Sequence, residues 1–311
     1  MKDRRRVLVA TLLLIVLPAL LTVGEAAWYH RWIAENGTIV SSGIDRSFYL
    51  YVPPSYDRST PAPLVISMHG AGMRAVAHMH TSQWNRIADR YGFIVVYPSA
   101  IKGQGPLVWD FGRGGASEDV PFIADLIEHI AASHNVDRTR VYANGLSNGG
   151  GMTFALSCTM SERIAAVGLV GTAFTVPWEW CTDTRPVPMI AFHGTDDTGT
   201  PYHGGKTWIA PPGTAFPDIP TYIANWSRRN RCAAKAADLI VAADVTRRSY
   251  TNCANNASVQ FYTIEGGGHT WPGGGPLPEW FVGTTTQTID ASQLMWEFFS
   301  EHPLQQALVE R

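Results

Sequence analysis

Apolar and polar positions along the chain follow two different periods. Continuous apolar runs that end at glycine or a polar residue are typical of strands buried on both faces, and they cover residues 64–68, 93–97, 164–170 and 187–192. A late strand is expected over residues 259–264. Apolar residues at helical spacing predict helices over residues 80–91, 123–130, 222–229 and 287–299. Alternation at residues 37–40 and 47–52 predicts a β-hairpin that turns near residues 43–45. Strands alternating with helices predict an α/β fold with a mostly parallel central sheet covered by helices on both faces.

The first 27 residues have a pattern of their own. A basic segment, residues 2–6, precedes an apolar run over residues 7–24, and small residues follow it. This is the pattern of a secretory signal peptide or an uncleaved membrane anchor. The run is long for a signal peptide and just long enough to span a bilayer. We expect export, with residues 1–27 outside the fold and one folded domain over residues 28–311; cleaved and anchored forms both stay open.

Composition narrows the classes of function. The chain is 45% hydrophobic and 16% charged with a net charge of −2, and no basic block suggests a nucleic-acid partner. The four cysteines lack C-x-x-C spacing, which argues against a zinc site; they are Cys158, Cys181, Cys232 and Cys253. Two disulfides are the favoured interpretation in an exported protein, with free buried thiols as the alternative. Sequential pairing, one of three possible, would close two loops of about twenty residues and contribute about 3 kcal/mol each.

One stretch carries the pattern of a reactive serine. An apolar strand leads into a G-x-S-x-G sequence at residues 145–149, and a helix is expected beyond it. A serine at the apex of a tight turn between strand and helix is the arrangement of a nucleophile elbow. The two flanking glycines leave space where strand and helix pack closely. Ser147 is therefore a candidate nucleophile, and an ordinary turn serine is the alternative.

Two later loops offer an acid and a base. Asp196 and Asp197 follow the strand at residues 187–192, at the sheet edge where open α/β sheets place their ligands. His269 lies between glycine runs after the strand at residues 259–264. Serine, acid and histidine in this order are typical of an α/β-hydrolase triad, in which the histidine takes the serine proton and the acid orients the imidazole.

A tetrahedral intermediate on the serine would need two backbone N–H donors. Asn148, directly after the serine, would supply one, and Ala71 or Gly72 would supply the other. His69 and His193 are rival bases, but each precedes a glycine at the end of a strand, which favours structural roles.

These motifs resemble those of the secreted polyhydroxybutyrate-depolymerase-like esterases, a family that also includes feruloyl and acetylxylan esterases. The resemblance spans roughly residues 37–303, and its most specific segment is His269 followed by Thr-Trp-Pro-Gly. It implies a single-domain α/β hydrolase that cleaves carboxylic esters without a metal or an organic cofactor. It also places the acid at Asp197, through the pattern H-G-x-x-D, and its cysteine pairing is similar to the sequential one. Ala71 is a departure, because members often carry cysteine there.

We expect a secreted serine esterase acting on polyhydroxyalkanoate-type oligomers or on feruloyl or acetyl esters. Its substrate would lie against tryptophans, for each of which core packing is the alternative; the candidates are Trp84, Trp109 and Trp271. A serine peptidase of the prolyl-oligopeptidase type is the second hypothesis, and a non-catalytic binding protein on a hydrolase scaffold is the third. The only membrane contact expected is through the N-terminal segment. The oligomeric state and the particular ester stay open.

Overall fold

The computed structural model describes residues 35–305, with gaps at residues 101–106, 113–116, 175–180, 182–184, 208–214 and 276. The chain divides into two compact units, residues 1–35 and 36–311, and every element described below belongs to the second. The predicted signal or anchor segment lies outside the described residues. Among the residues that are described, no helix has the length and apolar character needed to cross a membrane.

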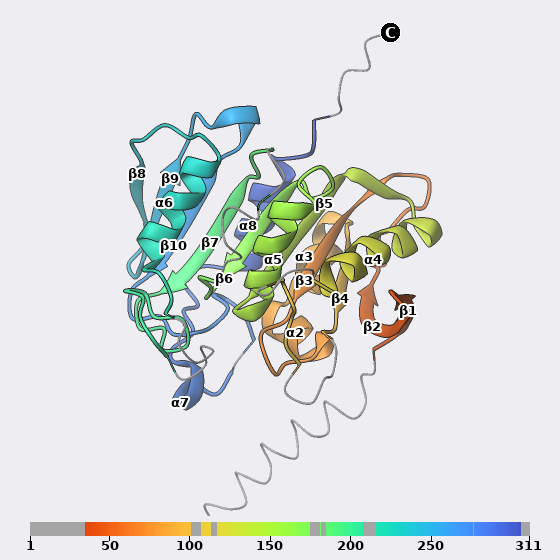
Figure 1. The fold of residues 1–311 in the computed structure, drawn as a ribbon, viewed down its shortest axis with the longest axis horizontal. Coiled ribbons are helices and arrows are strands. Elements are labelled where there is room, and N and C mark those ends of the chain that lie inside the picture. Colours follow the sequence, from red (N-terminus) through yellow and green to blue (C-terminus); the bar gives the residue numbers. More distant parts are fainter. Residues whose placement is uncertain are drawn as a thin grey trace, which may run out of the picture. The chain divides into compact units, whose positions relative to one another are not determined.

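Ten strands in the described part of the chain form one sheet (Figure 1). They are β1 (Gly37–Ser41), β2 (Ile44–Tyr51), β3 (Ala62–Met68), β4 (Ile94–Pro98), β5 (Val136–Leu146), β6 (Ala166–Val170), β7 (Met189–Gly194), β8 (Ala237–Ala242), β9 (Val245–Tyr250) and β10 (Val259–Ile264). Their order is β1-β2-β4-β3-β5-β6-β7-β10-β9-β8. All neighbours from β4 to β10 are parallel, and antiparallel pairs extend the sheet at both edges. The predicted mostly parallel sheet is therefore confirmed.

Helices cover both faces of the sheet, as predicted. One face carries α4 (Asp119–Ser133), α5 (Asn148–Thr159) and α6 (Ile219–Arg229), and the other carries α2 (Ala75–Ser82), α3 (Trp84–Tyr91) and α8 (Ala291–Ser300) (Figure 1). Strand β3 shows why both faces need cover, because all seven of its residues are buried. Its Leu64, Ile66 and Met68 join the core cluster beneath α4 and α5, while Ser67 contacts His78 of α2 on the opposite face.

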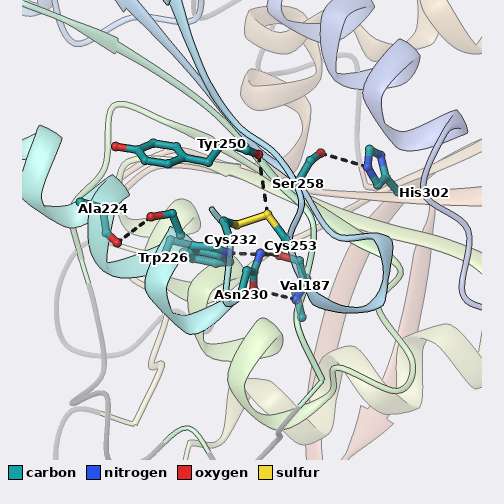
Figure 2. The surroundings of a disulfide bond; sticks show 10 residues. Val187, Ala224, Trp226, Asn230, Cys232, Tyr250, Cys253, Ser258 and His302 are labelled. Carbon is teal, nitrogen blue, oxygen red and sulfur yellow. Dashed lines mark hydrogen bonds between the residues drawn. A yellow bond between two sulfur atoms is a disulfide. The ribbon is translucent and has the colours of Figure 1, made fainter. Parts of the chain in front are cut away.

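Several boundaries differ from the prediction for identifiable reasons. The helix expected over residues 80–91 is two helices, α2 and α3, because Gln83 adopts a left-handed conformation with φ 53° between them. Strand β7 begins at Met189 because the side chain of Asn230 bonds both backbone groups of Val187, at 3.1 and 2.7 Å (Figure 2). The next residue, Pro188, has no N–H to offer a neighbouring strand. The hairpin of β8 and β9 was not predicted, since nearly all of β8 is exposed and lacks a buried pattern.

Two disulfides have the sequential pairing: Cys158 with Cys181 and Cys232 with Cys253. Cys158 lies in α5, the helix that follows Ser147. Cys232 follows α6, and its disulfide links that region to the segment that leads into β10 (Figure 2). Both bridges therefore hold helices of the same layer to the chain that follows them.

Candidate active site

Ser147 lies at the turn between β5 and α5. Its backbone has φ 54° and ψ −118°, a conformation that a non-glycine residue seldom adopts. Two backbone bonds hold the turn: the Ser147 amide donates to the Val170 carbonyl of β6 at 2.8 Å, and the Gly150 amide donates to the Ser147 carbonyl at 2.9 Å. A strained residue that its surroundings hold in place is a common feature of functional sites.

The predicted close packing around the serine is confirmed. A Cβ on Gly145 would lie 2.3 Å from the carbonyl carbon and oxygen of Gly149. A Cβ on Gly149 would lie 2.3 Å from the Met68 carbonyl oxygen of β3. Both distances are far below van der Waals contact, so the turn between β5 and α5 requires glycine at both positions.

Asp197, which is buried, and the partly exposed His269 form a hydrogen-bonded pair. His269 Nδ1 lies 2.8 Å from Asp197 Oδ2 and 3.0 Å from Oδ1. The Gly199 and Thr200 amides donate to Oδ1 at 2.8 and 2.7 Å. Because an ionised carboxylate only accepts hydrogen bonds, we infer that the His269 proton is on Nδ1. This tautomer leaves Nε2 free to act as a base.

The carboxyl of Asp197 is ionised at neutral pH. Burial by itself would raise its pKa, but the charge of His269 and the hydrogen bonds from His193 and His269 outweigh burial and hold the pKa well below its usual range. An ionised Asp197 can orient His269 without taking up its proton.

The two rival histidines are engaged elsewhere. His193 Nε2 lies 2.7 Å from the Thr200 carbonyl and 3.3 Å from Asp197 Oδ2. His69 uses both ring nitrogens, because Nδ1 lies 2.8 Å from the Gly70 carbonyl and Nε2 accepts from the Ala100 amide at 3.0 Å. The structural roles expected for both residues agree with these contacts.

Ser147 and His269 line the same pocket, whose volume is about 700 Å³. A Cβ on Gly171 would lie 3.3 Å from His269 Nδ1 and 3.4 Å from Asp197 Oδ2. Gly171 directly follows Val170, the residue whose carbonyl binds the Ser147 amide. The end of β6 therefore lies against both the serine turn and the Asp–His pair, and the three candidate residues meet at one edge of the sheet.

The structure distinguishes the two candidates for the second oxyanion donor. The Gly72 amide donates to the Leu107 carbonyl at 2.8 Å, so it is already engaged. The Ala71 amide has no backbone carbonyl partner among the described residues. Ala71 and Asn148 both line the pocket beside Ser147. These two backbone amides are therefore the candidate oxyanion donors.

Of the three predicted tryptophans, the structure brings only Trp109 to the pocket, and its indole donates to the His69 carbonyl at 2.9 Å. Trp84 and Trp271 are fully buried in the core. The Trp84 indole donates to Asn144 Oδ1 at 3.2 Å and the Trp271 indole to Ser292 Oγ at 3.1 Å. Core packing, the alternative interpretation, therefore holds for these two residues.

Other apolar side chains form much of the pocket wall and were not predicted. They include Met73, Phe111, Phe174 and Phe281. Phe174 had one usable signal, since it follows a buried strand by four residues and so lies at the edge where ligands bind. Phe281 had none, because the four-residue helix α7 (Glu279–Val282) is too short to show a period. Within the described ranges, no group of three or more His, Cys, Asp or Glu side chains is placed to hold a metal ion.

Comparisons with known proteins find similarity to esterases. Residues 46–177 match the family described as esterase PHB depolymerase. Feruloyl esterase B of Piromyces equi is 28% identical over 231 residues, which are 72% of this chain and 42% of the relative. The putative esterase NocK of Nocardia uniformis subsp. tsuyamanensis is 28% identical over 84% of this chain and 80% of its own length. The chain thus spans less than half of the feruloyl esterase it matches.

A solved structure shares the fold. Acetyl xylan esterase from Aspergillus awamori superposes with a TM-score of 0.57 at 17% identity, covering 85% of this chain and 98% of that one. The chain is therefore similar in sequence to the esterase PHB depolymerase family over residues 46–177, and it shares its fold with a solved esterase.

Proposed function

We propose that this protein is a secreted serine esterase that cleaves carboxylic esters through an acyl-enzyme on Ser147. The observation that carries the proposal is the hydrogen bond between Asp197 and His269, at 2.8 Å, together with the pocket that His269 and Ser147 both line. A serine hydroxyl is a weak nucleophile at its ordinary pKa, and this pair supplies the base that it needs.

The chemistry proceeds in two halves. His269 Nε2 takes the Ser147 Oγ proton as the oxygen attacks the ester carbonyl, and the amides of Ala71 and Asn148 stabilise the resulting oxyanion. The intermediate collapses when His269 passes its proton to the leaving alcohol. Water then attacks the acyl-enzyme with His269 again as base, and the acid is released.

The pocket favours an apolar group larger than acetyl. Aromatic side chains form much of its wall, among them Trp109, Phe111, Phe174 and Phe281. Polyhydroxyalkanoate-type oligomers and feruloyl esters fit that character, and acetyl esters would fill only part of the space. The names of two relatives, a feruloyl esterase and an acetyl xylan esterase, agree with esters of these kinds.

Export is part of the proposal. The basic and apolar pattern of residues 1–27 supports it. The two disulfides also support it, because such bonds persist in oxidising compartments.

Labelling with a fluorophosphonate probe tests the proposal. Wild-type protein is expected to react and Ser147→Ala is expected not to, while Ser55→Ala, an exposed serine outside the pocket, reacts like the wild type. A folded wild-type chain that stays unlabelled would contradict the proposal. Parallel assays on p-nitrophenyl esters and peptide anilides distinguish the esterase from the peptidase, and cleavage of the anilides alone would favour the peptidase.

A further inference from the structure

The wall of the pocket beside His269 has a chemical role of its own. We propose that residues 277–282, which include α7, receive the leaving alcohol of the ester, and that the exposed ring of Phe281 binds the apolar part of that alcohol. This inference rests on the proposed esterase function, and it adds to that function which part of the pocket binds the alcohol.

The pocket has two sides, and a different set of hydrogen bonds fixes the chain on each side. On one side are the oxyanion donors, and two hydrogen bonds attach the 107–109 segment to them: Gly72 amide to Leu107 carbonyl at 2.8 Å, and Trp109 amide to Asn148 Oδ1 at 2.6 Å. On the other side is His269, whose amide donates to the Val282 carbonyl at 2.6 Å. Residues 277–282 thus lie on the histidine side of Ser147.

The contact between α7 and the histidine loop is close. A Cβ on Gly268 would lie 2.2 Å from the Val282 carbonyl oxygen, and the Gly268 amide donates to the Thr284 carbonyl at 2.9 Å. The Thr270 hydroxyl donates to the same Thr284 carbonyl at 3.3 Å. The segment that carries Phe281 is therefore attached to the backbone on both sides of His269.

The reaction assigns a substrate group to each side. The carbonyl oxygen must point at the amides of Ala71 and Asn148, whereas the leaving oxygen must lie within reach of His269 Nε2 to receive its proton. A side chain on the segment bonded to His269 is consequently next to the alcohol. Phe281 lines the pocket with 51% of its surface exposed, so a bound apolar alcohol would remove exposed aromatic surface from water.

The neighbouring Trp280 provides a matched control. It lies on the same helix, is 87% exposed, and does not line the pocket. Truncating either aromatic to alanine removes a ring from α7, and the two rings lie in contact with centroids 5.7 Å apart. Only the Phe281 ring lines the pocket, so a direct contact with the alcohol predicts a much larger effect at Phe281.

The experiment uses two sets of esters with Phe281→Ala, Phe281→Leu and Trp280→Ala. One set keeps the acetyl group and enlarges the alcohol from methyl to 1-naphthyl, and the other keeps p-nitrophenol and lengthens the acyl chain. For Phe281→Ala, the ratio of kcat/KM for naphthyl acetate to that for methyl acetate is expected to fall about tenfold or more. In Phe281→Leu the same ratio is expected to fall less, and in Trp280→Ala it is expected to change less than about twofold.

Breakdown of the acetyl-enzyme gives a second readout. The alcohol has left before this step, so its rate, measured after the p-nitrophenyl acetate burst, is expected to be the same in wild type and Phe281→Ala. A loss that follows the acyl chain would overturn the inference, and so would an equal loss for all alcohols together with slower acetyl-enzyme breakdown. Fluorophosphonate labelling of each variant separates these outcomes from failure of the esterase proposal, in which the wild type itself stays unlabelled.

Discussion

The change Asp197→Asn replaces one carboxylate oxygen with an amide NH₂ and alters the hydrogen bonds of the pair. With the remaining oxygen at the Oδ1 position, the bonds from the Gly199 and Thr200 amides, at 2.8 and 2.7 Å, are retained. The NH₂ then occupies the Oδ2 position, 2.8 Å from His269 Nδ1 and 3.3 Å from His193 Nε2. His269 Nδ1 and His193 Nε2 both carry protons in the wild type. The new NH₂ group would therefore place a hydrogen-bond donor against a donor at both contacts.

His269 can relieve this conflict by changing tautomer. With its proton on Nε2, Nδ1 accepts from the new amide, but Nε2 can no longer take the proton of Ser147. The base is lost while the fold persists. We therefore expect kcat/KM to fall roughly 10⁴-fold, which corresponds to about 5.5 kcal/mol of transition-state free energy.

Hydrolysis of a p-nitrophenyl ester measures the loss, and circular dichroism checks that the variant is folded. Asp196→Asn is the matched control, because the carboxyl of this exposed neighbour accepts one long hydrogen bond, from Thr195 Oγ1 at 3.5 Å, and its backbone bond to Gly267 is kept in the variant. It is expected to keep activity within about twofold of wild type. If Asp196→Asn were the inactive variant and Asp197→Asn kept more than a tenth of the activity, the assignment of the acid would be wrong.

Two further predictions concern stability. Burial, with a smaller effect from His69, lowers the pKa of His78 to about 3, so the unfolded chain takes up the His78 proton first as pH falls. Stability is therefore full above about pH 6.5 and declines toward pH 3, by about 2 kcal/mol between 6.5 and 5. Urea unfolding of His78→Asn at several pH values is expected to show a free energy of unfolding that changes less steeply with pH in that range. An unchanged pH dependence would contradict this. Burial also lowers the pKa of His302, which contributes equally to both proteins. Removing the Cys232–Cys253 bridge, whose cysteines are 21 residues apart, is expected to lower the free energy of unfolding by about 3 kcal/mol. A double Cys→Ala variant measures this in urea, and a loss under about 1 kcal/mol would refute the chain-entropy reasoning.

The centre of the fold could be predicted because burial on both faces leaves a direct mark on the sequence. Strand β10 has the predicted bounds, residues 259–264, and every residue of β4, β6 and β7 is buried. The exposed β8 leaves no such mark. The break at Gln83 also could not be predicted, since glutamine is an ordinary helix residue and only the packed structure holds its φ at 53°.

The candidate reactive residues could be predicted because each follows a buried strand and carries its own chemistry. Ser147, Asp197 and His269 come after β5, β7 and β10. The pocket wall could not, because it assembles from segments that are distant in the chain and individually resemble core or surface. Trp84 and Trp109 illustrate this: both are buried, but only Trp109 also lines the pocket.

A continuous set of hydrogen bonds would hold the two proposed oxyanion donors, the amides of Ala71 and Asn148, in place before substrate binds. Asn148 follows the nucleophile, and its side-chain oxygen accepts from the Trp109 amide at 2.6 Å. The Trp109 indole donates to the His69 carbonyl at 2.9 Å, and the His69 ring contacts the Gly70 carbonyl and accepts from the Ala100 amide. Gly70 precedes Ala71, so the turn that presents one donor is bonded through a single tryptophan to the residue that presents the other. Donors fixed in this way need no reorganisation as charge develops, which is the condition under which backbone amides contribute most to catalysis.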